Sequence, residues 1–343
     1  MKIDIRDLTL KELTKEIVTL GEPPHRARQI FSWVNQKNAD SFDKMCNLPK
    51  TLISDLKKKY DIGDLVCEER LRAKDGTEKF LWKLRDGKYV ESVLIKEKSR
   101  ITLCLSTQVG CRFKCRFCAS GTGGFTRNLE VSEITGQVLS AQEISKCRVT
   151  NIVFMGMGEP LDNYQNLEKA IEIINHPKGI GIGARKITVS TCGIIPGILK
   201  LKDIGLQIEL SVSLHAANDQ LRNELVPVNR RYPLEKLMKA CEEYFEDTGR
   251  VVTLEYTIIK DKNDLLKDAD KLAKIAKKLK AKVNLIGCNP YSNKDSGRPS
   301  AGRVQAFKDR LRSRGVTTTI RRSRGGDIMA ACGQLAAQKR DKK

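Results

Sequence analysis

The sequence predicts an α/β protein: a parallel sheet with helices on its outside, preceded by a small helical and β-hairpin module. Three observations predict this fold class. From residue 101 onward, strand-like and helix-like segments alternate six times, as expected for consecutive βα units. The first sixty residues carry apolar side chains at helical spacing instead. Between these parts, Asp-Gly pairs mark β-hairpin turns. We expect one domain over residues 1–96 and a second over 97–343.

The N-terminal part predicts helices followed by hairpins. Three segments show helical spacing of apolar residues: 8–21, 21–36 and 48–60. Pro49 stands where the start of a helix favours proline. Asp75-Gly76 and Asp86-Gly87 follow, and strand-like segments flank the second pair. A short antiparallel sheet should therefore connect the helices to the main domain.

The main domain predicts six strands with helical segments between them. The strand-like segments are 101–106, 151–156, 186–191, 207–214, 251–258 and 282–287. A doubly wound sheet and a partial barrel both fit this order, and in both the active site lies at the carboxyl ends of the strands. Cysteines, glycines and polar residues gather at these ends: Cys111 to Cys118, Gly156 to Pro160, Ser190, Ser213 to His215, and Asn289. This clustering indicates an enzyme.

Composition narrows the class of partner and the compartment. An excess of 63 Lys and Arg over 42 Asp and Glu gives a net charge of +21, which implies a polyanion, nucleic acid first and a membrane surface second. The sequence has no run of about 18 apolar residues for a membrane span, and no apolar signal core at its start. Eleven cysteines, an odd number, argue against structural disulfides and for the cytoplasm. The Lys and Arg of residues 1–96 suit contact with RNA.

The strongest motif is the triplet Cys111, Cys115 and Cys118, directly after the first strand of the main domain. Thiolates bind iron–sulfur clusters, and a [4Fe–4S] cluster normally takes four of them. Three ligands leave one iron open, as a catalytic metal centre requires in order to bind a substrate. A zinc site with a distant fourth ligand and unligated core cysteines are the alternatives. The spacing favours the cluster.

Two further thiols lie near the predicted site. Cys104 precedes the triplet, and Cys332 follows a strand-like segment near the C-terminus. A lone cysteine is most often a small buried hydrophobe. Cations close to Cys332 in sequence favour its thiolate: Arg321, Arg322 and Arg324. Two separated thiols beside a metal centre suggest covalent chemistry.

Together these patterns resemble one family. The triplet, with Phe117 before its last cysteine, is the signature of the radical S-adenosylmethionine (SAM) superfamily. Further matching segments are 104–111, 124–129, 156–161, 211–216 and 330–335. The combination resembles the dual-specificity 23S rRNA and tRNA adenine-C2 methyltransferases over about residues 15 to 335. The resemblance implies an incomplete (βα)6 radical-SAM barrel behind a small N-terminal domain.

The resemblance also implies cofactors and partners. Cys111, Cys115 and Cys118 would hold one [4Fe–4S] cluster per subunit. SAM would be bound by residues at the strand ends: Gly158, Glu159, Ser190, Ser213, Leu214, His215 and Asn289. Taken alone, Gly158 and Glu159 could belong to a tight βα turn, and Ser190, Ser213, His215 and Asn289 are each more often polar strand caps than ligands. The partners would be 23S rRNA, tRNA and an electron donor such as flavodoxin. The protein itself would be a cytoplasmic monomer.

For the reaction, the resemblance implies methylation at C2 of an adenosine in 23S rRNA and of the adenosine 3′ to the anticodon in tRNA. One SAM methylates Cys332, and a second yields the radical that takes hydrogen from this S-methyl group. The methylene radical adds to C2, Glu91 accepts the C2 proton, and Cys104 attacks the Cys332 sulfur to form a disulfide and release the product. Without the resemblance, Glu91 would be interpreted as a solvent-facing strand carboxylate.

Departures and rival functions remain open at this point. Gly287 and Cys192 differ from residues frequent in the family, and Gly287 is expected to loosen the loop that aims Asn289. A C8 methyltransferase of the antibiotic-resistance type shares every cysteine discussed. A noncatalytic iron–sulfur RNA-binding protein would leave Cys104 and Cys332 unexplained. A methylthiotransferase would need a second cluster, for which the other cysteines lack close spacing.

Overall fold

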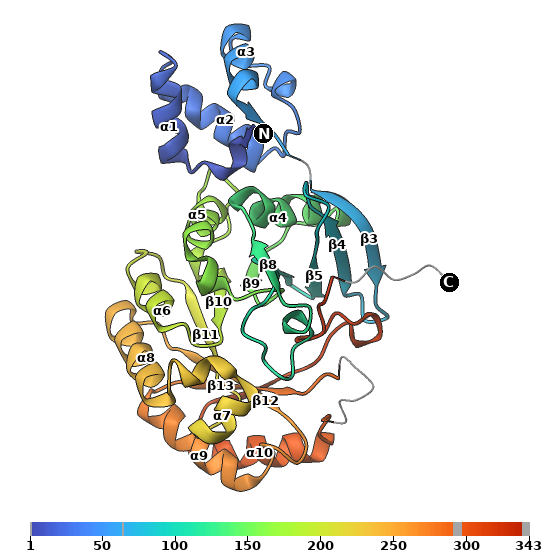
Figure 1. The fold of residues 1–343 in the computed structure, drawn as a ribbon, viewed down its shortest axis with the longest axis vertical. Coiled ribbons are helices and arrows are strands. Elements are labelled where there is room, and N and C mark those ends of the chain that lie inside the picture. The colour runs from blue at the N-terminus through green and yellow to red at the C-terminus, as the bar shows by residue number, and fades with distance from the viewer. Residues whose placement is uncertain (1, 64, 291–296, 338–343) are drawn as a thin grey trace.

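Helices make up the N-terminal part, as predicted. They are α1 (Leu10–Thr19), α2 (His25–Asn35) and α3 (Lys50–Lys59). The computed structural model describes residues 2–63, 65–290 and 297–337. Figure 1 shows these helices at one end of the molecule. The parallel pair β1 (Ile3–Asp4) and β2 (Tyr60–Asp61) joins the two ends of this part; strands of two residues carry no periodicity that a sequence could reveal.

Antiparallel strands follow, and both predicted hairpins are confirmed. The strands are β3 (Val66–Arg72), β4 (Glu78–Lys83) and β5 (Tyr89–Glu97). Gly76 and Gly87 have φ angles of 82° and 77°, a conformation that glycine adopts without a steric penalty. β5 also pairs with β6 (Arg100–Cys104). The chain therefore passes residues 96 and 97 within one continuous sheet.

The main sheet contains all six predicted strands, with ends shifted by a few residues. They are β6, β9 (Asn151–Phe154), β10 (Ile187–Thr191), β11 (Glu209–Ser213), β12 (Thr253–Ile258) and β13 (Lys282–Gly287), followed by β14 (Thr318–Arg321). In the described residues the order is β14-β13-β12-β11-β10-β9-β6-β5-β4-β3. The parallel strands thus follow the chain, whereas a doubly wound sheet reverses its order. The structure is the partial barrel.

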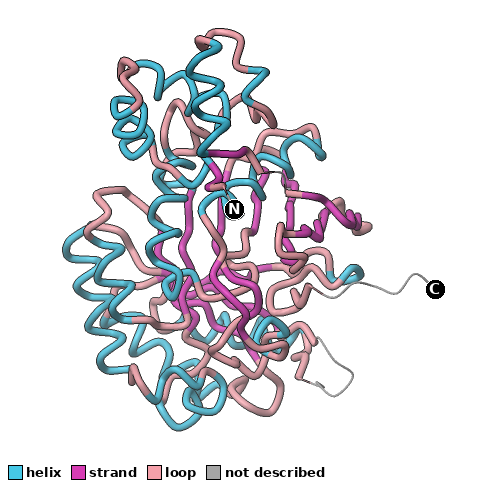
Figure 2. Tube along the Cα trace, turned by 45° about the horizontal axis from the view of Figure 1, so that its top comes forward, coloured by secondary structure: helices cyan, strands magenta, loops and turns pink. Residues whose placement is uncertain are grey.

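Helices cover the outside of this sheet. They are α4 (Val131–Ser145), α5 (Tyr164–Asn175), α6 (Ile195–Lys202), α7 (Asp219–Leu225), α8 (Leu234–Thr248), α9 (Leu266–Lys278) and α10 (Ala301–Ser313). Figure 2 shows the strands inside and helices around them. The predicted helices correspond to α4, α5, α8 and α9. The short α6 and α7 escaped prediction, since 8 and 7 residues give too few turns for a clear period.

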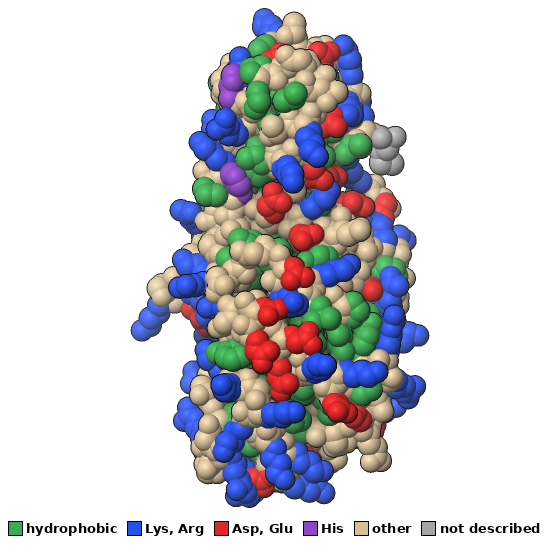
Figure 3. Space-filling model, turned by 90° about the vertical axis from the view of Figure 1, so that its left-hand side faces the viewer, with side chains coloured by type: hydrophobic (Ala, Val, Ile, Leu, Met, Phe, Trp, Pro, Cys, Tyr) green, Lys and Arg blue, Asp and Glu red, His purple; other side chains and the backbone are tan. Residues whose placement is uncertain are grey.

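The surface carries the excess of basic residues. Figure 3 shows Lys and Arg over most of one face, with Asp and Glu gathered near its middle. Among the described residues, no helix is long and apolar enough to cross a membrane.

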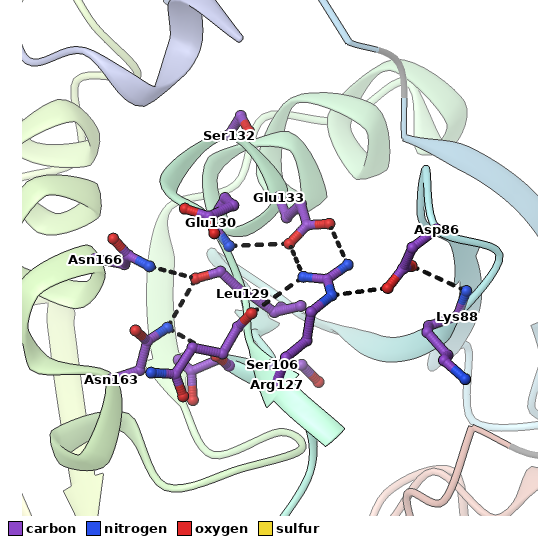
Figure 4. A network of polar contacts seen from close by, with 12 residues as sticks. Asp86, Lys88, Ser106, Arg127, Leu129, Glu130, Ser132, Glu133, Asn163 and Asn166 are labelled. Atoms are coloured by element: carbon purple, nitrogen blue, oxygen red, sulfur yellow. Dashed lines mark hydrogen bonds and ion pairs between the residues drawn. The ribbon is translucent and has the colours of Figure 1, made fainter. Parts of the chain in front are cut away.

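The hairpin of β7 (Gln108–Gly110) and β8 (Phe125–Asn128) carries the loop with the cysteine triplet. Arg127 on β8 fixes this hairpin to its surroundings (Figure 4). Its guanidinium donates to both carboxylate oxygens of Glu133 in α4, at 2.7 and 2.8 Å, and to Asp86 in the β4–β5 turn at 2.8 Å. Bidentate arginine–carboxylate pairs are among the strongest polar contacts in proteins. One side chain therefore joins three elements at the base of the loop.

We expect Arg127→Ala to lower the free energy of unfolding by about 2 kcal/mol, because it leaves two carboxylates without their charge-assisted hydrogen bonds. Chemical denaturation measures this change. Arg185→Ala, which truncates an exposed arginine, is the matched control and should change the value by less than about 0.5 kcal/mol. Equal stability of the two variants would contradict the anchoring role of Arg127.

Candidate active site

Two adjoining cavities lie at the carboxyl ends of the parallel strands. The smaller, ≈ 150 Å³, is lined by all three cysteines of the triplet and by most of the residues expected to bind SAM: Gly158, Glu159, Ser190, Ser213, His215 and Asn289. The larger, ≈ 660 Å³, runs along the inner face of the strands and is lined by Cys104. Cys118, Asn289 and Cys332 line both cavities. The structure thus brings together all the expected site residues except Leu214 and Glu91.

Backbone hydrogen bonds hold the triplet loop at its start and in its middle. The N–H of Cys111 donates to the Gly124 carbonyl at 2.8 Å, and the N–H of Arg116 donates to the Leu225 carbonyl at 3.1 Å. Gly110 has a φ of 76°, and a Cβ there would lie 1.9 Å from the Gly124 oxygen. Only glycine therefore fits where the loop leaves β7. The second contact seats the middle of the loop on the end of α7.

The three cysteines are half-buried, and desolvation of their thiols is the main cause of their raised pKa values. The pKa of Cys111 rises to about 12, and those of Cys115 and Cys118 also lie above the ordinary range. Cationic iron bound to such thiols would hold them as thiolates. Within the described ranges, no three His, Cys, Asp or Glu side chains are grouped closely enough for a single metal ion. A [4Fe–4S] cluster takes one thiolate per iron, and the three cysteines, which line one cavity, could serve as three of its ligands.

Glu159 faces the smaller cavity as a buried carboxylate. Its oxygens accept hydrogen bonds from the backbone N–H groups of Leu161 at 3.1 Å and Cys192 at 2.7 Å. Burial nevertheless raises its pKa. Gly158 has a φ of 96°, and a Cβ there would lie 2.5 Å from the Gln108 side chain. A cationic ligand group beside Glu159 would favour its ionised form, since opposite charges stabilise each other where water is excluded.

His215 is held as a neutral imidazole. Its Nδ1 accepts a hydrogen bond from the backbone N–H of Thr257 at 2.9 Å, and its ring meets Phe117 edge-on at a centroid distance of 4.4 Å. Burial, followed by the nearby positive charge of Arg222, lowers its pKa to about 3. Because Nδ1 accepts, the single ring proton of the neutral form lies on Nε2. His215 is therefore a hydrogen-bond donor at the wall of the smaller cavity.

A C-terminal segment, residues 325–337, places Cys332 against the triplet loop. The Ala119 N–H donates to the Gly333 carbonyl at 2.7 Å, and the Ser120 hydroxyl donates to the Leu335 carbonyl at 2.7 Å. A Cβ at Gly333 would lie 2.8 Å from the Phe117 carbonyl oxygen. The residue after Cys332 must therefore be glycine for this contact to form.

Asn289 belongs to the same contact. Its side-chain amide donates to the Cys332 carbonyl at 3.4 Å and accepts from the Ser323 hydroxyl at 2.7 Å. The loop after Gly287 is thus held by the C-terminal segment. A Cβ at Gly287 would meet only Pro299, at 3.9 Å.

Cys104 and Cys332 are both free thiols on the wall of the larger cavity. Burial, and next the proximity of Cys332, raises the pKa of Cys104 to about 12. Arg321 lines both cavities and donates to the Met155 sulfur at 3.0 Å. The coulombic effect of Cys332 is the largest cause of the raised pKa of Arg321. The two thiols and one guanidinium therefore form one group.

Glu91 is not the solvent-facing carboxylate that its strand position alone indicates. It is 3% exposed, because the C-terminal segment covers β5. One oxygen pairs with Lys79 Nζ at 2.8 Å, and the other accepts from the N–H groups of Ala336 and Ala337 at 2.9 and 3.0 Å. Leu214 is also fully buried, and its carbonyl accepts from the Arg222 side chain at 3.1 Å. Neither residue lines the two cavities in the part of the chain that the structure describes.

Two site residues were not predicted. Gln108 accepts from the Glu159 N–H at 2.9 Å and donates to Asp162 and Asn128, so it fixes the loop that carries Glu159. It lies three residues before Cys111 in a matching segment, which is a usable sequence signal. Arg222 is fully buried between the strand ends, and nothing in its local sequence distinguishes it from a surface arginine.

We expect the free energy of unfolding of His215→Gln to decrease less on acidification than that of the native chain. The folded chain keeps His215 neutral down to about pH 3, whereas the unfolded chain protonates it below its ordinary value of about 6.5. Acidification from pH 6.5 therefore stabilises the unfolded state, by about 1.4 kcal/mol for each pH unit. Denaturation at several pH values measures the difference between native chain and variant. His25→Gln, at an exposed histidine, should leave the pH slope unchanged; a native slope in His215→Gln would refute the assignment.

Comparisons with known proteins identify the family to which this chain belongs. Family models match twice: the N-terminal domain of ribosomal RNA large subunit methyltransferases over residues 3–62, and the radical SAM superfamily over 105–273. A probable dual-specificity RNA methyltransferase RlmN from Geobacillus kaustophilus is 47% identical, covering 98% of this chain and 93% of its own. One from Thermotoga sp. strain RQ2 is 46% identical over 97% of each chain.

A solved structure agrees over nearly the whole fold. The crystal structure of a radical SAM methyltransferase from Sphaerobacter thermophilus has a TM-score of 0.91 and 44% identity, covering 98% of this chain and 100% of its own. Membership of the superfamily implies a [4Fe–4S] cluster and SAM as cofactors. On these grounds the chain belongs to the dual-specificity RNA methyltransferase family of the radical SAM superfamily, which methylates adenines of rRNA and tRNA.

Proposed function

We propose that this protein methylates C2 of adenosine in 23S rRNA and in tRNA, and that Cys332 carries the methyl group. The observation that carries the proposal is the position of Cys332 on the walls of both cavities. On one side it borders the residues proposed to bind SAM, and on the other it borders Cys104. A thiol that first receives a methyl group and then delivers it to RNA needs access to both sides.

Most of the residues proposed to hold the cofactors line the smaller cavity. Cys111, Cys115 and Cys118 would hold the [4Fe–4S] cluster, which supplies the electron for reductive cleavage of SAM. SAM itself would be held by the polar groups at the strand ends: Gly158, Glu159, Ser190, Ser213, Leu214, His215 and Asn289. Glu159 suits the methionyl ammonium because it is a buried carboxylate. Leu214 would contribute only backbone groups, since its side chain lies in the core.

The larger cavity suits the adenine base. Its volume of ≈ 660 Å³ lies in the range of ligand sites, about 300–1,000 Å³. A base inside a helix is inaccessible at C2, so the adenosine must leave its stack to enter. The net charge of +21 supports phosphate binding along the approach. We assign residues 1–96 to an accessory part that contacts RNA, and 97–343 to the catalytic barrel.

Three side chains of the larger cavity and β5 would perform the covalent steps. The Cys332 sulfur, which lines both cavities together with Arg321, would accept a methyl group from SAM. After Cys332 has become linked to adenine C2 through a methylene group, Glu91 accepts the C2 proton. Cys104 thiolate then attacks the Cys332 sulfur: the S–S bond forms, the bond from sulfur to the methylene carbon breaks with its electron pair on that carbon, a proton from solvent completes the methyl group, and the RNA leaves with 2-methyladenosine. Both Glu91 oxygens are engaged here, so the segment over β5 must detach before the proton transfer.

The discriminating experiment is mass spectrometry of nucleosides from unmodified 23S rRNA and tRNA after anaerobic incubation with reconstituted protein, SAM and a reductant. We expect 2-methyladenosine in both RNAs. 8-Methyladenosine would assign the chain to the antibiotic-resistance type of enzyme. A bound cluster without any cleavage of SAM would leave a noncatalytic RNA-binding protein.

Cys332→Ala should abolish methylation, because no other thiol lines both the SAM side and the RNA side except Cys118, a cluster ligand. Nucleoside mass spectrometry measures the loss, and iron analysis verifies that the variant keeps its cluster. Cys46→Ala, which removes an exposed cysteine of the N-terminal part, is the control and should retain full activity. Methylated product from Cys332→Ala would disprove the Cys332 route.

Cys104→Ala should instead trap the protein on its RNA. Without the attacking thiol, the bond between Cys332 and the base cannot be exchanged for a disulfide, so a covalent complex accumulates. Denaturing gel electrophoresis with labelled RNA detects it as a slowly migrating band. Free, fully methylated RNA from this variant would remove Cys104 from the mechanism.

A further inference from the structure

Arg222 on α7 is a fully buried arginine that the reaction described above does not use. Its side chain has 0% exposure. In the described residues, no carboxylate lies within ion-pair distance of it, and its hydrogen bonds run to neutral acceptors. A buried charge without an opposite charge is unfavourable by several kcal/mol. A negatively charged group close to the guanidinium would therefore stabilise it.

The neutral acceptors of Arg222 lie at the ends of two strands of the cofactor site. The guanidinium donates to the carbonyl of Cys192 at 2.7 Å, after β10, and to the carbonyls of Ser213 and Leu214 at 3.2 and 3.1 Å, at the end of β11. The third nitrogen of the guanidinium, Nη1, donates to the side-chain oxygen of Asn229 at 2.6 Å. Arg222 therefore fixes the backbone that presents Ser213 and its neighbours to the smaller cavity.

The positive charge of Arg222 also reaches the triplet loop. The loop rests on α7 through the hydrogen bond from Arg116 to the Leu225 carbonyl at 3.1 Å. Cys115 packs in the small apolar cluster formed by Cys192 and the residues after Arg222. The charge of Arg222 counteracts the effect of burial on Cys115, whose pKa nevertheless stays raised, and contributes to the lowered pKa of His215.

We propose that Arg222 is a positioning residue whose fixed positive charge stabilises the reduced state of the cluster bound by Cys111, Cys115 and Cys118. This inference rests on the proposed function only for the presence of that cluster. Reduction adds one negative charge to a site that already carries three thiolates. A buried cation favours the added charge, and net charge near a cluster is one of the factors that set its potential. The cluster in turn is the negative partner that the guanidinium lacks.

The test is a redox titration of reconstituted protein without RNA, followed by electron paramagnetic resonance of the reduced cluster. Arg222→Gln should lower the equilibrium constant for reduction at least tenfold, which is about 59 mV for one electron. Arg222→Lys retains the charge and should remain within about threefold of the native value. Arg116→Gln removes an exposed guanidinium from the triplet loop, and its change should stay within about twofold, since solvent screens that charge.

Each contrary outcome is distinct. If both Arg222 variants keep the native reduction potential of the cluster but bind SAM more weakly, Arg222 only holds the backbone of the site in place. An equal decrease in Arg222→Lys, or in Arg116→Gln, would also overturn the role of its fixed charge. If Arg222→Gln fails to fold, Arg222→Met decides, because it fills the same space with an uncharged apolar side chain: the same tenfold decrease is expected, and a native potential would overturn the role of the charge. If the RNA assay yields no 2-methyladenosine, the proposed function fails, but the measured reduction potentials still test the role of Arg222.

Discussion

The parallel ladder of β6 and β9 to β14 determines where every proposed ligand-binding side chain lies. Each strand pairs with the next one along the chain, so the carboxyl ends meet along one curved edge. Residues that are far apart in sequence, such as Cys118, Ser213 and Asn289, thereby line one cavity. The antiparallel strands extend the same sheet beyond β6, which places Glu91 of β5 beneath the C-terminal segment.

Ionisable groups in this site lie away from water, and their states follow from specific neighbours. Glu159 is held by two backbone N–H groups, His215 by one, and Arg222 by backbone carbonyls. The site thus presents a carboxylate, a neutral imidazole donor and a cation within the same protected region. Charges placed in this way interact strongly with a charged cofactor, because little water screens them.

The features that the sequence predicted are those encoded in short stretches. The triplet spacing, the Asp-Gly turns and the alternation of strands and helices each lie within a few residues, and the strand ends followed from one rule on βα folds. Glu91 and Arg222 behave differently. The burial of Glu91 depends on a segment some 245 residues later in the chain. The burial of Arg222 depends on its position between the ends of two strands. Neither environment produces a pattern in the neighbouring sequence. Glu91 entered the prediction only through family resemblance.

The C-terminal segment is attached at several points, and this has a consequence for how the chain tolerates change in length. Asp327 accepts from the Lys74 N–H at 3.1 Å, Gly333 is fixed to Ala119, and Ala336 is fixed to Glu91. An inserted or deleted residue between positions 327 and 336 would displace Cys332 relative to both cavities. The attachments of Asp327 and Ala336 fix both ends of this interval, so they could not move to accommodate the change. We infer that the chain tolerates no change in length within this interval, whereas a largely exposed turn such as residues 203–207 after α6 carries no such limit.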